Sequence, residues 1–250
     1  LVGSEMCIRD SLERLEELLH KVQKALGEYL ERERARFPRF YFVGDEDLLE
    51  MLGSSRRDVT SVARHLGKMF GGAAAVRTEG DGAVSSVVSR EGEALVLDEH
   101  VQLGDEVPVY AWLAALERSM RVTLAERTTE AVSALEPVWQ AAGKPGAGAA
   151  GAASTDGAPL LPWLDAFPAQ AAVLAAQVVW THAVEAALPD LAAPLAAVET
   201  LLQQLADALA ADAPPLRRRK CEQLVTELTH QREVLVHLCD AHAATATAFP

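Results

Sequence analysis

Two glycine-containing stretches are the places in this 250-residue chain where nucleotide chemistry could occur. The run GAGAAG, Gly146 to Gly151, matches the G-x-G-x-x-G pattern, which binds dinucleotides only between a strand and a helix. Here a helical pattern precedes the run. Gly143-Lys144 is followed by Pro145, and no glycine stands five residues before Gly143, so the phosphate-binding loop is absent. We therefore expect no cofactor and no ATP hydrolysis in this segment.

Two other groups contain metal-ligating side chains. His237, Cys239 and His242 lie close in sequence, but on a helix only Cys239 and His242 share a face, and no fourth ligand is evident. A small core cysteine with histidines at its edge is the simpler interpretation. The acidic run from Asp45 to Asp47 could bind a cation, but it more often caps a helix and complements its dipole. No G-x-S-x-G nucleophile motif occurs, so we predict neither a metal site nor a catalytic group.

A basic cluster opens a predicted helix near the carboxyl end. It consists of Arg217, Arg218, Arg219 and Lys220, in the first turn, where the helix dipole disfavours positive charge. The cluster is either a solvated patch or a docking surface for an acidic partner. The formal net charge of −13 argues against a nucleic-acid partner for the chain as a whole.

Aromatic side chains are concentrated in one short stretch. Four of the nine Phe and Tyr residues lie in the run FPRFYF, which comprises Phe37, Pro38, Arg39, Phe40, Tyr41 and Phe42. The run lacks the basic interleaving of a nucleic-acid platform. We expect 40–43 to be extended, with the rings buried as a wedge beside the first helix, and the fixed φ of the proline to stiffen the joint.

Helical elements must position these residues. Half of the residues are hydrophobic, many of them alanine, which favours helix. Apolar residues repeat at three- and four-residue steps. They predict helices over 12–34, 46–52, 59–70, 112–136, 168–188, 191–211 and 215–245, with caps at Asp45 and Asp58. The run AVSSVVSREGEALVL, 83–97, predicts one β-hairpin. We therefore predict a mostly α fold, an elongated helical bundle or rod with one small hairpin.

The chain is expected to contain four parts. Residues 1–11, LVGSEMCIRDS, can be back-translated into a transposase-type sequencing adapter, so we predict that they are an artefact and that the native protein begins further upstream. Residues 12–142 form a helical lobe with the aromatic joint and hairpin, 143–159 a flexible Gly/Ala-rich loop, and 160–250 a helical bundle. Three scattered cysteines indicate a reducing compartment, and 169–188 is too polar to span a membrane.

Several motifs, in order along the chain, resemble those of dynein heavy chains. FPRFYFVGDEDLLEMLG, from Phe37, resembles the hallmark of the dynein linker, and its VGDEDLLE form looks most like the cytoplasmic type. LHKVQKALGEYLERE, VARHLGKMFGG, SREGEALVL and WLAALERSMRVTLA are similar to successive family elements. A pattern W…P-x-Q…Q-x-x-W-T and the stretch PPLRRRKCEQLVTELTHQRE follow. The resemblance covers nearly all of 12–250, although 143–159 is unusually rich in Ala and Gly.

The resemblance implies a mechanical element. In dyneins the linker is a curved rod of helices across a ring of AAA+ modules, and ATP binding and hydrolysis in the ring bend and straighten it. This chain would be the carboxyl-terminal half of that rod, ending just before the first AAA+ module, with the cluster Arg217 to Lys220 near the rod-to-ring junction. The implied partners are the ring, dynein subunits and microtubules in the cytoplasm, with ATP and Mg only in the full-length motor.

A different class of function remains open. A helical adaptor could bind a partner protein through an exposed face, without any link to ATP. An enzyme would need a pocket with convergent polar groups, and the sequence indicates none.

Overall fold

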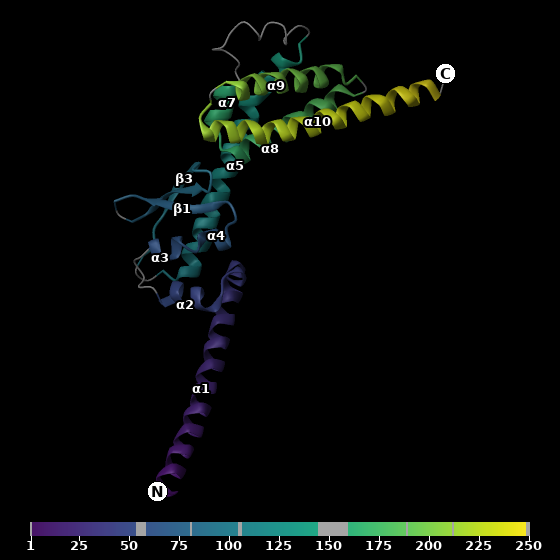
Figure 1. The fold of residues 1–250 in the computed structure, drawn as a ribbon. Helices are drawn as coiled ribbons and strands as arrows, with labels where there is room; N and C mark the ends of the chain where they lie inside the picture. Colours follow the sequence, from purple (N-terminus) through teal and green to yellow (C-terminus); the bar gives the residue numbers. More distant parts are fainter. Residues whose placement is uncertain are drawn as a thin grey trace. The chain divides into compact units, whose positions relative to one another are not determined.

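The computed structural model describes residues 2–53, 59–80, 82–104, 107–144, 160–188, 190–211 and 213–248, without the side chains of 2–8, 10 and 242–248. The described residues are mostly helical, with one small sheet (Figure 1), as the sequence predicts. They form two compact units. The first comprises Leu1–Arg90 and Val96–Ser119, and the second comprises Glu91–Leu95 and Met120–Pro250.

The first unit combines helices with the sheet. Its elements are α1 (Val2–Arg36), the 3-10 helix η1 (Pro38–Phe42), α2 (Asp45–Gly53), α3 (Val59–Ala63), α4 (Leu66–Met69), β1 (Ala73–Thr78), β2 (Val84–Ser89), most of β3 (Ala94–Val101) and the start of α5 (Val109–Ala142). Trp112, Leu113 and Leu116 of α5 are fully buried, as are Leu48 and Met51 of α2. Helix α5 therefore supplies the centre of this core.

The sheet has three strands in the order β1-β2-β3. The predicted hairpin is β2 and β3, whose turn contains Gly92 at φ +87°. Strand β1 was not predicted. It pairs antiparallel with β2, with Val76 opposite Val87, and follows directly after α4. Its sequence AAAVRT has only one β-branched residue at its centre, so pairing with β2 rather than local propensity makes it a strand.

The second unit is a helical bundle. It contains the end of α5 together with α7 (Leu160–Ala166), α8 (Ala169–Ala187), α9 (Ala192–Ala210) and α10 (Pro215–Ala248). Its core includes five buried alanines on α8 and α9: Ala171, Ala172, Ala175, Ala176 and Ala197. At Gly143 an added Cβ would lie 3.1 Å from the carbonyl oxygen of Ala193, so α9 closely approaches the end of α5. Small residues therefore set the packing here.

Three predicted elements differ from the structure. Of the predicted extended segment 40–43, residues 40–42 belong to η1, and Val43 has the predicted extended backbone. The helix predicted over 59–70 is two short helices, α3 and α4, separated by a turn at Arg64 and His65. Within α4, an added Cβ at Gly67 would be 3.3 Å from the carbonyl of Ala73, so α4 lies close to β1. Helix α5 does not end before Pro137 but continues to Ala142. Burial of Val138 and Trp139 in the bundle offsets the backbone hydrogen bond that this proline removes.

The remaining predicted helices correspond to observed helices, and a few predictions concern residues that the structure does not describe. The predicted helices 12–34, 46–52, 168–188, 191–211 and 215–245 correspond to α1, α2, α8, α9 and α10, while α7 was not predicted. The cap at Asp58, the GAGAAG run and all but two residues of the 143–159 segment lie outside the described residues. The two compact units divide inside α5, between Ser119 and Met120. Among the described residues, no helix has the length and apolarity needed to cross a membrane.

Candidate functional site

The aromatic run forms one turn of 3-10 helix at the end of α1. A 3-10 helix has three residues per turn, so residues three apart share a face. Phe37 and Phe40 accordingly point inward, 5 % and 0 % exposed, with ring centroids 5.1 Å apart in an edge-to-face arrangement. Tyr41 and Phe42 are 59 % and 70 % exposed. The predicted burial of the rings is therefore wrong for these two, because it assumed the two-residue repeat of a strand.

Arg39 ties this turn to distant parts of the first unit. Its guanidinium donates to both carboxylate oxygens of Glu117 on α5, at 3.2 and 3.1 Å, and to the carbonyl of Met69 at 2.9 Å. The same group lies 4.6 Å from the ring centroid of Phe70. Because a planar guanidinium matches a carboxylate in two-point geometry, Arg39 fixes orientation as well as distance.

Arg34 fixes the other side of the same turn. It donates to Asp45 at 2.5 Å, to Glu31 at 3.0 Å and to the carbonyl of Val43 at 3.3 Å. The hydrogen bond to Asp45 is the main reason that the pKa of Arg34 is raised above its ordinary value. Helix α2 begins at Asp45, and the carbonyl of Gly44 accepts the first helical hydrogen bond. Asp45 therefore belongs to the first turn, not the predicted cap position, and joins α2 to α1.

Lys220 occupies a buried position in the second unit. Its Nζ lies 2.7 Å from Glu93 and donates to the carbonyls of Phe167 at 2.7 Å and Leu164 at 3.3 Å, and its side chain is 6 % exposed. Glu93, from the turn between β2 and β3, also accepts the backbone N–H of Ala169 at the start of α8. Lys220 thus joins the hairpin turn, α7, α8 and α10 within one unit.

The basic cluster is consequently not a uniform exposed patch. Arg217 donates to both carboxylate oxygens of Asp165, and this interaction raises its pKa. Arg218 and Arg219 are exposed, and neither pairs with a carboxylate that the structure describes. Burial removes Lys220 from any docking surface, whereas Arg218 and Arg219 are exposed, and their docking role stays a prediction. The carboxylates of Asp165 and Glu93 offset the unfavourable helix dipole.

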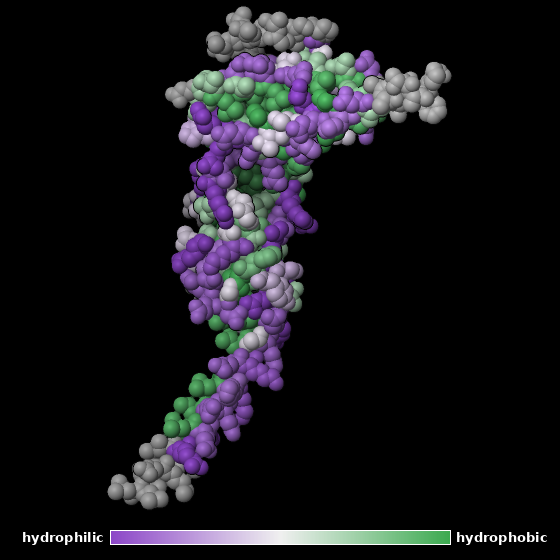
Figure 2. Space-filling view, turned by 45° about the vertical axis from the view of Figure 1, so that its right-hand side comes forward, coloured by the Kyte–Doolittle hydropathy of each residue, from purple (hydrophilic) through white to green (hydrophobic). Residues whose placement is uncertain are grey.

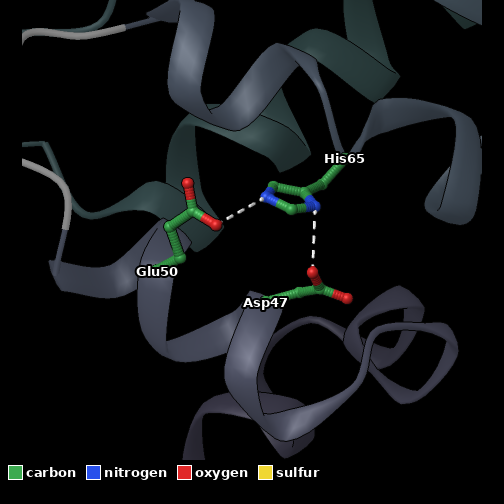
Figure 3. Close-up of side chains that lie close together, drawn as sticks. All are labelled: Asp47, Glu50 and His65. Atoms are coloured by element: carbon green, nitrogen blue, oxygen red, sulfur yellow. Dashed lines mark ion pairs between the residues drawn. The ribbon is translucent and has the colours of Figure 1, made fainter.

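A third cluster lies between α2 and the start of α4 (Figure 3). The buried ring of His65 stands between two carboxylates, with Nδ1 3.6 Å from Asp47 and Nε2 3.6 Å from Glu50. Lys68 donates to Asp47 at 2.5 Å, and Arg64 to Glu50 at 2.9 Å. Sequence reasoning considered Asp47 for a cation but missed Glu50 and His65. The i, i+3 spacing of Asp47 and Glu50 was visible, whereas the approach of His65 depends on the break between α3 and α4.

The other sequence motifs form no site in the described residues. His237 is exposed, Cys239 packs against the bundle core, and the side chain of His242 is outside the described residues. Cys221 is buried, and burial raises the pKa of its thiol. A hollow of about 350 Å³ between α9 and α10 is lined by Leu202, Leu209 and Val225 with a few polar neighbours. None of these presents a nucleophile beside a general base.

Comparison with known proteins identifies the family. Residues 2–131, about half of the chain, match the family described as dynein heavy chain, N-terminal region 2. This chain belongs to the dynein heavy chain family. The match contains the whole aromatic joint with Arg34 and Arg39.

Individual relatives extend the similarity over almost the whole chain. It is 43 % identical over 246 residues to the cytoplasmic dynein heavy chain of Neurospora crassa, 39 % over 252 residues to that of Drosophila melanogaster, and 35 % over 243 residues to that of Dictyostelium discoideum. These alignments cover 97 %, 97 % and 92 % of this chain. The chain spans about 5 % of the length of each of these relatives.

Proposed function

We propose that this chain is a segment of the linker of a cytoplasmic-type dynein heavy chain, a mechanical element that bends and straightens over an AAA+ ring. The match to an N-terminal region of the family and the cytoplasmic names of its relatives support this proposal. In it, the segment converts ATP hydrolysis elsewhere in the protein into minus-end-directed movement along microtubules. The segment itself is not an enzyme and binds no cofactor.

The joint around Arg39 is the observation that carries the proposal. A part that transmits load needs contacts between segments far apart in sequence, made by groups that tolerate little displacement. Arg39 meets Glu117, 78 residues away, through two hydrogen bonds, and holds Met69 and Phe70 from a third segment. Phe37 and Phe40 are buried at the same turn, and Phe37 packs on Phe40 and on Phe70. Pro38, at the start of η1, restricts the backbone at the same point.

The contacts of Lys220 give the second unit a comparable tie. A buried ammonium that satisfies one carboxylate and two carbonyls cannot shift without leaving charge or hydrogen-bonding capacity uncompensated. The turn of the hairpin is thereby held to the bundle through Glu93. We propose that this tie keeps the hairpin turn and the bundle moving together.

The proposed partners follow from the family. They are the AAA+ ring of the same polypeptide, other dynein subunits and, through the full-length protein, the microtubule, in the cytoplasm and on the cytoskeleton. ATP and Mg would be bound in the ring. Arg218 and Arg219, exposed beside the internally paired Arg217, are the residues that we propose to contact the ring.

A helical adaptor is the rival function, and one observation favours it. Helix α1 carries a band of exposed apolar side chains (Figure 2), which include Leu12, Leu15, Leu19, Val22 and Leu26. Such a face could bind a partner helix in a protein without ATPase modules.

The transcript downstream of Pro250 and nucleotide turnover separate the two functions. The motor predicts a G-x-x-x-x-G-K-[ST] loop soon after this segment in the same reading frame, and no ATP turnover by the purified segment alone. An in-frame stop codon or an unrelated downstream domain would support the adaptor. ATP hydrolysis by the segment itself would contradict both.

A further inference from the structure

His65 carries a buried nitrogen that the surrounding protein does not satisfy. The residue is 5 % exposed, and its Nε2 has no hydrogen-bond partner among the residues that the structure describes. The nearest carboxylate oxygen, on Glu50, is 3.6 Å from Nε2, too far for a hydrogen bond. Burial of an unpaired polar atom is unfavourable, so a group that binds Nε2 would stabilise the site.

The two carboxylates are already oriented toward the ring. Lys68 holds Oδ2 of Asp47 and Arg64 holds Oε1 of Glu50, which leaves the other oxygen of each carboxylate facing His65 (Figure 3). Ligating carboxylates in known metal sites are fixed by outer partners in the same way.

We propose that His65, Glu50 and Asp47 form a binding site for one divalent transition metal ion of the zinc class. One ligand atom from each residue lies within 4.8 Å of the others. Tetrahedral zinc with bonds of about 2.0 to 2.1 Å needs ligand atoms about 3.4 Å apart. The side chains of Asp47 and Glu50 are 32 % and 46 % exposed and can close this difference, whereas burial fixes the imidazole.

The donor set selects the ion. One imidazole nitrogen with two carboxylate oxygens suits zinc, while magnesium and calcium prefer sites made of oxygen alone. Nε2 is the ligating nitrogen, because it is the one without a partner among the described residues, and Asp47, which lies nearer Nδ1, has to turn toward Nε2 to reach the ion. Three protein ligands leave the fourth position to water. Bound metal would join α2 to His65, the residue before α4. This site does not depend on the proposed motor function.

Isothermal titration of the chelator-treated 250-residue chain with zinc chloride tests the proposal. We expect one zinc ion per chain at this site and no comparable heat from magnesium chloride. His65→Gln and Glu50→Gln should each weaken zinc binding by about tenfold or more, because each removes a direct ligand. Lys68→Gln should weaken it several-fold, because Lys68 holds the carboxylate of Asp47 in place. Cys239→Ala and His20→Gln should leave the affinity at this site unchanged.

Several results would overturn the proposal. One is the absence of binding at millimolar zinc, and another is an affinity that neither His65→Gln nor Glu50→Gln changes. Loss of binding in Cys239→Ala alone would place the ion elsewhere. If His65→Gln does not fold, Glu50→Gln decides, because Glu50 is partly exposed and glutamine can still accept from Arg64.

Discussion

The two units of this chain differ in the size of the side chains at the contacts between their helices. In the first unit, large rings and two arginines meet around η1, with Phe40 fully buried and Arg39 bound to Glu117. In the second, buried alanines of α8 and α9 pack among larger side chains, and Gly143 allows the backbone of α9 to come close. The first unit should therefore be sensitive to loss of volume, and the second to gain of volume.

The charged side chains that link elements within each unit differ in their exposure to solvent. Arg39 is partly exposed, and its hydrogen bonds can be replaced in part by water. Lys220 is buried, and it pairs with Glu93, which is 19 % exposed, so its loss removes a buried charge together with an ion pair. The comparison predicts that a buried lysine in the bundle is worth more to stability than a better-oriented arginine at the joint.

The largest expected effect is at the joint. Phe40→Ala should reduce the free energy of unfolding of the first unit by about 3 to 5 kcal/mol, because it removes a fully buried ring. Urea-dependent hydrogen exchange of amides in residues 30–119 measures this unit separately. Phe42→Ala is the matched control, since that ring is 70 % exposed. A loss below about 1 kcal/mol for Phe40→Ala would show that the ring is not part of a close-packed joint.

Lys220→Ala should have the next largest effect, in the second unit. Removal of a buried charge that pairs with Glu93 should cost about 3 kcal/mol, seen as faster amide exchange in α7, α8 and α10. Arg219→Ala, one residue earlier and exposed, should change stability by less than about 0.5 kcal/mol. A double-mutant cycle with Glu93→Gln should show coupling between the two residues, and strict additivity would contradict the tie.

Ala175→Leu tests the small-residue packing of the bundle. Ala175 is fully buried on α8, so three extra carbon atoms should cost about 2 kcal/mol in the second unit. Ala186→Leu, on the exposed side of the same helix, should be nearly neutral, because alanine and leucine have similar helix propensities. If the two variants had equal free energies of unfolding, α8 would not be closely packed at Ala175.

Arg39→Lys should be milder than either core change. Lysine keeps the charge but cannot bind both oxygens of Glu117 while also reaching Met69, so we expect a loss of about 1 kcal/mol. Urea unfolding of the first unit, read by amide exchange near Met69 and Phe70, measures it. If Arg39→Lys reduced the free energy of unfolding as much as Phe40→Ala, the expected larger effect of the core substitution would be wrong.

The smallest effect concerns pH. The pKa of Asp47 is lowered, first by its hydrogen bond from Lys68 and then by the charges of Lys68 and His65. Because the folded pKa lies below the unfolded value of about 3.9, this contribution is complete above about pH 5 and is lost as the pH falls through the folded pKa. In Lys68→Gln, with chelator present, the stability of the first unit should decline less steeply on acidification. The same slope as in the unchanged chain would exclude this pair as a contributor.

Local patterns were sufficient for most helices and for the hairpin. The three- and four-residue spacing of apolar residues predicted α1, α8, α9 and α10, and the β-branched residues around Arg90 to Gly92 predicted the hairpin. Each of these patterns reflects the conformation that the segment itself favours. Long-range packing determined what was missed. Burial of Trp139 continues α5 past Pro137, pairing with β2 makes a strand of Ala73–Thr78, and packing of Phe37 on Phe40 selects a 3-10 turn.

The candidate sites were predictable in position but not in contacts. The aromatic run and the basic cluster are visible in the sequence, yet the partners of Arg39 and Lys220 lie 78 and 127 residues away, in Glu117 and Glu93. Burial of Lys220 depends on carbonyls at the end of α7, which was itself not predicted. His65 likewise enters its cluster only because a helix breaks beside it.

The most direct test of the account uses a full-length dynein heavy chain that contains this segment. Microtubule gliding velocity and ATP turnover would be measured together for Phe40→Ala and Phe42→Ala. We expect that Phe40→Ala lowers velocity while ATP turnover without microtubules is retained, and that Phe42→Ala preserves both. If Phe40→Ala left velocity intact, or lowered turnover in the same proportion as velocity, this segment would not be the element that carries the motor's force.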